Sequence, residues 1–312
     1  MANEGSEMSR STISAFELSR LFPNEPAAMA YIERRFWPNG AVCPKCNDKG
    51  RVTKRKDGFY SCNACVLKFT VRTGTVFERS HIPLHKWLVA MYLLVTARKG
   101  ISSVQLSKQI GIRQASAWFL LHRLREACGP KLSMLCGIVE VDEVFFGGKE
   151  QNKHMSQRVL YRKTGKSFKT AVIGLRERGG RSRAFTVKSV NTTSLLTAVR
   201  QNVLPGAEVH TDEYIGYRPL QQTHVHKTVN HSKEEFSRNG VTTNSVESMF
   251  AVMRRGLHGV YHHASEKHMG RYMNEFAWRL DRGSVERHTL DRLDSFVDAS
   301  AGRRITYKNL IA

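Results

Sequence analysis

The chain has 312 residues, a length typical of about two domains. Hydrophobic residues make up 41% of it, enough to bury a core, which excludes wholesale disorder. The net charge of +22 favours a polyanionic partner, most often nucleic acid, over an anionic membrane. The longest apolar run, 87–95, is too short to span a bilayer, and the N-terminal residues contain no apolar signal core. We therefore expect no membrane partner and a cytoplasmic, nucleoid-associated protein.

Residues 1–40 show weakly amphipathic helical spacing, and residues 41–80 contain four of the six cysteines. These four form two CxxC pairs separated by fifteen residues: Cys43, Cys46, Cys62 and Cys65. In a reducing compartment this spacing is typical of a zinc site, and two pairs argue against a redox motif. Four thiolates leave no open coordination position, so the sequence predicts a structural Zn²⁺ in a zinc ribbon.

Basic residues flank the cysteine pairs, Lys54 and Arg55 among them. We expect this positive face to contact DNA. The alternative is that it is a solvated surface around a module whose only role is in folding.

Residues 81–130 return to helical spacing and contain a candidate helix-turn-helix. Ser102 is the expected N-cap of its first helix, with Gln105 completing a capping box, and Gly111 is expected to end that helix. A second helix follows from about 113 to 127. Its start presents three residues that can reach base edges or phosphates: Arg113, Gln114 and Ser116. The pattern favours a DNA-reading motif over an ordinary helical hairpin.

From residue 136 onward, strand and helix patterns alternate. Strands are expected at 138–144, 169–176, 183–190 and 208–212, and a short strand is also considered at 227–230. Helices are expected at 192–203, 245–257 and 265–281, and the tail after 286 is helical around 290–297. The chain then divides into an N-terminal helical segment (1–40), a zinc ribbon (41–80), a helix-turn-helix region (81–130), a domain of alternating strands and helices (136–285) and a C-terminal helical tail (286–312).

Acidic residues are scarce, so those placed on strands are conspicuous. Strand alternation puts Glu140 and Asp142 on one face, and Asp212 ends a later strand. Glu247 lies on a predicted helix, where Asn244 and Arg254 share its face at offsets of three and seven.

Oxygen ligands from two strands and a helix suit two Mg²⁺ or Mn²⁺ ions, and such an ion pair can cleave phosphodiesters. Arg254 would then bind a nearby phosphate. Singly, each acid has an ordinary interpretation. Asp212 can cap a turn at Glu213–Tyr214, and Glu140, Glu143 and Glu213 are interpreted as surface or pairing charges.

The ordered motifs resemble the insertion-sequence DDE transposases that carry an N-terminal zinc ribbon, over residues 20–285. The similar segments are 139–143 with Gly147-Gly148-Lys149, 210–212 with Gly216-Tyr217, and 244–247 with Arg254 and 259–263. The resemblance implies an α/β, ribonuclease-H-like domain with a mixed five-stranded sheet flanked by helices. It also implies two-metal hydrolysis at the element's terminal repeats, followed by strand transfer into target DNA.

By this resemblance Asp142, Asp212 and Glu247 form the metal-binding triad. Some relatives use asparagine in the third role, and Asn244 is the alternative here; a carboxylate is the better ligand for magnesium. Synapsis of two double-stranded ends implies a homo-oligomer. The competing hypothesis is a non-catalytic DNA-binding regulator, in which the ribbon and the helix-turn-helix are functional and the carboxylates incidental.

Overall fold

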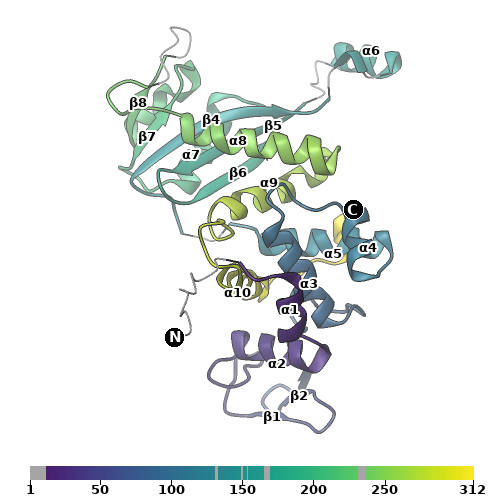
Figure 1. Ribbon diagram of the computed structural model, residues 1–312. Helices are drawn as coiled ribbons and strands as arrows, with labels where there is room; N and C mark the ends of the chain where they lie inside the picture. The colour runs from purple at the N-terminus through teal and green to yellow at the C-terminus, as the bar shows by residue number, and fades with distance from the viewer. Residues whose placement is uncertain (1–11, 131–132, 149, 153, 165–168, 231–236) are drawn as a thin grey trace, which may run out of the picture. The chain divides into compact units, whose positions relative to one another are not determined.

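The computed structural model describes residues 12–130, 133–148, 150–152, 154–164, 169–230 and 237–312 (Figure 1). The chain forms two compact units: residues up to Cys128 together with 282–312, and residues 129–281. In the described part of the chain, no helix is long and apolar enough to cross a membrane.

The first unit is mostly helical and includes a small antiparallel sheet ordered β1-β2-β3. Its elements are α1 (Ala15–Leu21), α2 (Glu25–Phe36), β1 (Val52–Lys54), β2 (Tyr60–Cys62), β3 (Leu67–Phe69), α3 (Leu84–Thr96), α4 (Ser103–Ile110), α5 (Gln114–Ala127), α10 (Thr289–Ser300) and α11 (Tyr307–Ile311). Local signals explain several boundaries. Ser14 and Glu17 form a capping box at the start of α1, and Asn24 caps α2.

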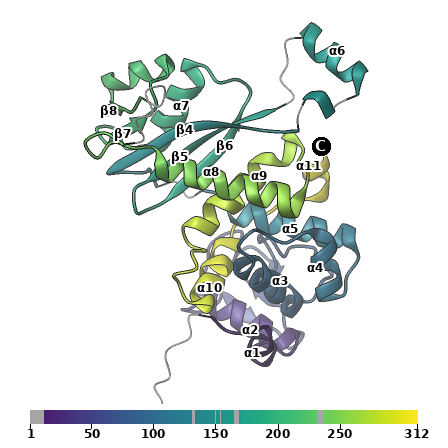
Figure 2. The same ribbon diagram turned by 45° about the horizontal axis from the view of Figure 1, so that its top comes forward.

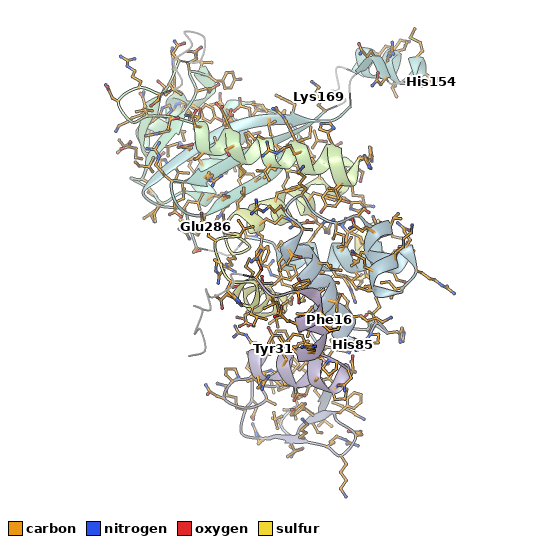
Figure 3. The ribbon with its side chains drawn as sticks, in the orientation of Figure 1. Phe16, Tyr31, His85, His154, Lys169 and Glu286 are labelled. Carbon is orange, nitrogen blue, oxygen red and sulfur yellow. The ribbon has the colours of Figure 1, made fainter. Side chains whose placement is uncertain are left out.

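Helix α10, from the C-terminal part of the chain, packs in this first unit, against α2, α3 and α5. Tyr31 of α2, labelled in Figure 3, donates a hydrogen bond to Asp294 of α10. Arg35 of α2 pairs with the same aspartate at 3.2 Å and also with Asp298. Burial and the Asp294 carboxylate together raise the pKa of Tyr31 well above its usual value. The segment after residue 282 is therefore part of the first unit's core.

The second unit is built on a five-stranded mixed sheet ordered β6-β5-β4-β7-β8 (Figure 2). Its elements are β4 (Ile138–Phe146), η1 (Glu150–Asn152), α6 (Met155–Thr164), β5 (Thr170–Glu177), β6 (Ser182–Val187), α7 (Thr192–Asn202), β7 (Glu208–Thr211), η2 (Ile215–Gln222), β8 (Val225–Thr228), α8 (Asn244–Gly256), η4 (Leu257–Tyr261) and α9 (Glu266–Leu280). β4, β5 and β6 are antiparallel neighbours, whereas β7 runs parallel to β4 and β8 parallel to β7. The predicted five strands are all found, with ends shifted by a few residues.

Helices cover both faces of this sheet. Val139 and Val141 of β4 pack with α7 and η2 on one face, while Val144 and Phe146 pack with α8 and α9 on the other. This alternation is the period of two expected of a strand buried on both sides. It puts Glu140 and Asp142 on the α8 face. The architecture confirms the ribonuclease-H-like mixed sheet flanked by helices.

Candidate functional site

The four cysteines lie together at one end of the ribbon sheet. Cys43 Sγ is 3.5 Å from Cys65 Sγ, Cys46 Sγ is 3.5 Å from Cys62 Sγ, and all four sulfurs lie within 4.8 Å of one another. Tetrahedral zinc with bonds of about 2.3 Å sets its sulfurs about 3.8 Å apart. Burial opposes ionisation of Cys43, but backbone N–H groups of Cys46 and Lys45 outweigh it and lower its pKa to about 7, whereas burial and hydrogen bonds with neighbouring thiols raise the pKa values of Cys46 and Cys65. The cluster therefore fits a structural zinc ion.

The aromatic packing beside the cysteines supports the same module. Trp37 follows α2, and its ring lies 5.1 Å from Tyr60 and 5.8 Å from Phe69 in edge-on contacts. This small core is too limited to hold three short strands without a further cross-link, which is the role that a zinc ion has in such modules.

The helix-turn-helix has the predicted local geometry. Ser102 accepts the backbone N–H of Gln105 at 3.1 Å, which is one half of the expected capping box, and Gly111 ends α4 with φ +62°. The residues expected to read DNA, Arg113, Gln114 and Ser116, are exposed at the start of α5. Ala117, Leu120, Leu121 and Leu124 of the same helix are buried, and Phe119 is half-buried. The start of α5 is therefore exposed, and the rest of the helix packs through an apolar face.

Lys54 and Arg55 lie on the ribbon and are exposed, but both lie near acids. Lys54 pairs with Glu33 at 3.2 Å and lies over the Tyr60 ring, and Arg55 Nε is 3.4 Å from Asp57. The Arg55–Asp57 pair is exposed, and exposed pairs contribute little stability, so Arg55 can exchange its partner for a phosphate at low cost. Glu33 is half-buried, but the Lys54 ammonium is exposed.

Two of the three predicted metal-binding acids lie on neighbouring parallel strands. Glu140 of β4 is paired with His210 of β7. Two residues further along these parallel strands, Asp142 is therefore level with Asp212, which directly follows the last residue of β7. Asp142 Oδ1 accepts the backbone N–H of Glu143 at 2.7 Å. Asp212 Oδ1 accepts the N–H of Tyr214 at 3.1 Å, so the turn-capping role is present; that bond needs only one oxygen of the carboxylate.

The third acid, Glu247, lies in the first turn of α8, where its Oε1 accepts a hydrogen bond from Thr243 at 3.2 Å. Asn244 and Arg254 are exposed on the same helix, on the face that bears Glu247. Arg254 is two turns further along, about 10 Å at the rise of an α-helix. The helix therefore presents an amide and a carboxylate at its start and a guanidinium further along.

The electrostatics of Asp142 indicate how these acids affect one another. Burial is the largest cause that raises its pKa, and the charges of Glu143, Asp212 and Glu247 raise it further, to about 7. A bound cation would relieve this repulsion, so the donor set fits divalent ions that prefer carboxylate oxygens. In the described part of the chain, the four cysteines are the only group of three or more His, Cys, Asp or Glu side chains placed closely enough to hold one ion. The carboxylates are spread more widely than the ligands of one shared ion.

The neighbouring acids were interpreted as surface or pairing charges. Glu140 is a pairing charge, 3.0 Å from Arg178, and the surface alternative is wrong for Glu140 and Glu143. Glu140 is 1% exposed, and Glu143 is partly buried and accepts a hydrogen bond from the Tyr217 hydroxyl at 2.6 Å. Burial and the charge of Asp212 raise the pKa of Glu143, although the Tyr217 bond lowers it. The sequence did not indicate that Arg178 would be the partner of Glu140 or that Tyr217 would be the partner of Glu143. The only sequence signal of their burial was the apolar residues on either side of the acids in 138–146.

Comparisons with known proteins agree with this geometry. Residues 134–281 match the family described as ISXO2-like transposase domain, and residues 23–67 match the family described as transposase zinc-ribbon domain. The chain is 29% identical over 281 residues to an uncharacterized protein in transposable element ISH50 of Halobacterium salinarum, covering 84% of this chain and 92% of that protein. No solved structure matches the chain. With the four-cysteine cluster and the mixed sheet, these matches show that the chain belongs to the insertion-sequence DDE transposases that carry an N-terminal zinc ribbon.

Proposed function

We propose that this protein is the transposase of its own insertion sequence: it binds the terminal inverted repeats, cleaves the phosphodiester bonds at the element's ends and joins the freed ends to target DNA. The observation that carries the proposal is the pairing of β4 with β7, which sets Asp142 level with Asp212. Burial raises the pKa of Asp142, and the charges of Glu143, Asp212 and Glu247 raise it further. Such unbalanced negative charge is costly in a folded protein and is characteristic of functional sites.

In this proposal Asp142, Asp212 and Glu247 hold two Mg²⁺ or Mn²⁺ ions. When bound, the ions activate the attacking oxygen and stabilise the leaving oxygen of an in-line displacement. The three residues supply oxygen ligands from a strand, a strand end and a helix. Arg254 binds a phosphate that flanks the scissile bond, because a guanidinium matches phosphate geometry. Asn244 faces the DNA beside Glu247 and is the alternative third ligand.

DNA is bound by the first unit as well. The exposed residues at the start of α5 are proposed to read the terminal repeats in the major groove, and the basic ribbon, held by Zn²⁺, to contact the backbone. Two ends must be brought together, so we propose a homo-oligomer in the complex with DNA. With six or more phosphate contacts, affinity should fall by about 10³-fold or more between 50 and 200 mM salt. A flat salt response would contradict DNA as the main partner.

The test is a magnesium-dependent nicking and joining assay on a plasmid that carries the DNA flanking the gene. Wild type is compared with Asp142→Asn and Asp212→Asn, which keep the side-chain shape and remove the charge. Glu213→Gln is the matched control, since Glu213 is an exposed acid next to Asp212. We expect end-specific joining by wild type and the control, and none by the two site variants.

Two outcomes would change the assignment. Tight binding without cleavage by wild type, in magnesium or in manganese, would favour the non-catalytic regulator. If Glu247→Gln keeps full strand-transfer activity and Asn244→Ala loses it, the third metal ligand is Asn244 and not Glu247.

A further inference from the structure

Glu140 is a buried carboxylate whose hydrogen bonds lead to the helix that carries Glu247. It lies on β4, two residues before Asp142 and on the same face, and is 1% exposed. Its Oε2 accepts the backbone N–H of Ser245 at 2.8 Å, the Ser245 hydroxyl at 2.5 Å and the N–H of Val246 at 3.2 Å. One oxygen on the central strand therefore holds the first turn of α8.

These donors are the ones that a helix cannot satisfy by itself. The first four N–H groups of an α-helix have no partner inside it, and a side chain at the N-cap normally accepts one of them. In α8 the N-cap is Thr243, whose side chain makes no capping bond. The cap comes instead from a strand 105 residues earlier in the chain, and its negative charge also suits the positive end of the helix.

The other oxygen of Glu140 binds Arg178, which directly follows β5. Arg178 Nη2 donates to Glu140 Oε1 at 3.0 Å, and Arg178 Nη1 donates to the carbonyl of Gly240 at 3.0 Å, in the segment that leads into α8. His210, buried in β7, accepts the N–H of Thr242 at Nδ1 and pairs with Glu208 through Nε2 at 2.6 Å. The first turn of α8 is thus tied to β4, and the segment before it is tied to β7 and to the end of β5.

This arrangement is costly if its only purpose is to cap a helix. Burying a carboxylate is unfavourable unless it is fully paired, and a cap from the helix's own N-cap residue would need no buried charge. Both oxygens of Glu140 accept N–H or O–H groups, so the residue is not suited to be a metal ligand itself. What the arrangement does provide is a fixed distance between β4, which carries Asp142, and the turn that carries Asn244 and Glu247.

We propose that Glu140 and Arg178 are positioning residues: they hold the first turn of α8 in register with Asp142, so that the acids on the strand and on the helix meet the same pair of ions. The inference rests on the proposed function of those acids. Partners that orient metal ligands usually change metal affinity by about 10–100-fold when they are lost. A displacement of about 1 Å in a reacting group slows catalysis by about 100-fold.

The test compares Glu140→Gln with Glu177→Gln in the full-length protein. Glutamine has one acceptor oxygen, so it must turn its NH₂ group towards either the donors of α8 or Arg178. Glu177 is the matched control because it is also a strand glutamate of this unit paired with an arginine, Arg181, at 2.9 Å. Glu177 also accepts hydrogen bonds from the backbone N–H and the thiol of Cys136. Ser245→Ala is a milder variant that removes one of the three donors.

Cleavage is measured against Mg²⁺ concentration, with DNA affinity and melting temperature in parallel. We expect Glu140→Gln to raise the half-saturating Mg²⁺ by about 10–100-fold, with DNA affinity unchanged, and Ser245→Ala to act in the same direction but less. Glu177→Gln should lower the melting temperature and leave the Mg²⁺ dependence unchanged. If Glu140→Gln changes only the melting temperature, the residue is merely structural and the proposal is overturned.

A second measurement does not depend on activity. Amide hydrogen exchange over 242–250 should rise in Glu140→Gln and not in Glu177→Gln, and no difference would overturn the positioning role. If wild type fails to cleave in either metal, the proposed function fails, and this exchange experiment still decides whether Glu140 holds the start of α8.

Discussion

Gly174 of β5 determines how closely α8 approaches the sheet. A Cβ at this position would lie 2.5 Å from Met249 Cε and 2.6 Å from two ring carbons of Phe250. The methionine methyl can move because it ends a flexible side chain, but Phe250 is 3% exposed and its ring is packed in the core. Gly174 is also paired with Asp142 across the sheet, so any displacement of α8 here occurs beside the candidate active site.

We predict that Gly174→Ala destabilises the second unit by about 1–3 kcal/mol, the usual penalty for an extra methyl in a packed core. Reduced freedom of the unfolded chain acts in the opposite direction, but contributes only about 0.4–1 kcal/mol. A unit of this size changes its melting temperature by about 2–4 °C for each kcal/mol, so a fall of several degrees is expected. Cleavage should fall as well, because Glu247 is on the displaced helix.

Thermal and urea denaturation of the full-length protein provide the measurement. Gly270→Ala in α9 is the matched control: its Cβ would meet Thr186 Oγ1 at 3.9 Å, an ordinary contact. Because alanine favours a helix over glycine, this control should gain about 0.5–1 kcal/mol. If Gly174→Ala melts at or above the wild-type temperature while the control behaves as expected, α8 does not pack on β5 in the way described.

Three further predictions concern charge, metal and DNA. In chelator-treated protein, the pKa of Asp142 is about 7 in the folded state and has its ordinary value of 3.8 in the unfolded state. The folded state is therefore destabilised as the pH rises from 3.8 to about 7. Asp142→Asn should therefore raise the melting temperature at about pH 8 and have little such effect at about pH 4; an equal effect at both would contradict the shift. Removing zinc, or Cys46→Ser, should unfold the ribbon and red-shift the fluorescence of Trp37, whereas Cys136→Ser should leave the zinc content unchanged; a zinc-free chain with unaltered fluorescence would refute this. Arg113→Ala should weaken binding to end DNA by about 10-fold or more while leaving the melting temperature within about 1 °C, since the side chain is exposed; equal affinities in a gel-shift titration would rule out its role.

Much of the fold is predictable because its signals are local. The CxxC spacing predicted the cysteine cluster, the alternation in 138–144 predicted a strand with Glu140 and Asp142 on one face, and Ser102 and Gly111 predicted the limits of α4. Each of these patterns depends on residues within about one or two turns or strand lengths of one another.

The site was predictable only in part. The order of Asp142, Asp212 and Glu247 along strand, strand and helix indicated three acids, and the resemblance supplied their roles, which stay predictions. The sequence did not indicate that Glu140 would be buried as a cap or that Tyr217 would bind Glu143, because in each case the partner is far away in the chain.

What the sequence by itself determined, then, is the set of elements and the chemistry each one carries, since propensity, capping and ligand spacing act over short distances. Only the tertiary structure decided which of these elements meet. Glu140 reaches Ser245 across 105 residues, and Tyr31 reaches Asp294 across 263, which joins α10 to the N-terminal helices. Such contacts arise from the packing of whole helices and sheets, where the burial of one face fixes its neighbours, and no short window of sequence records that outcome.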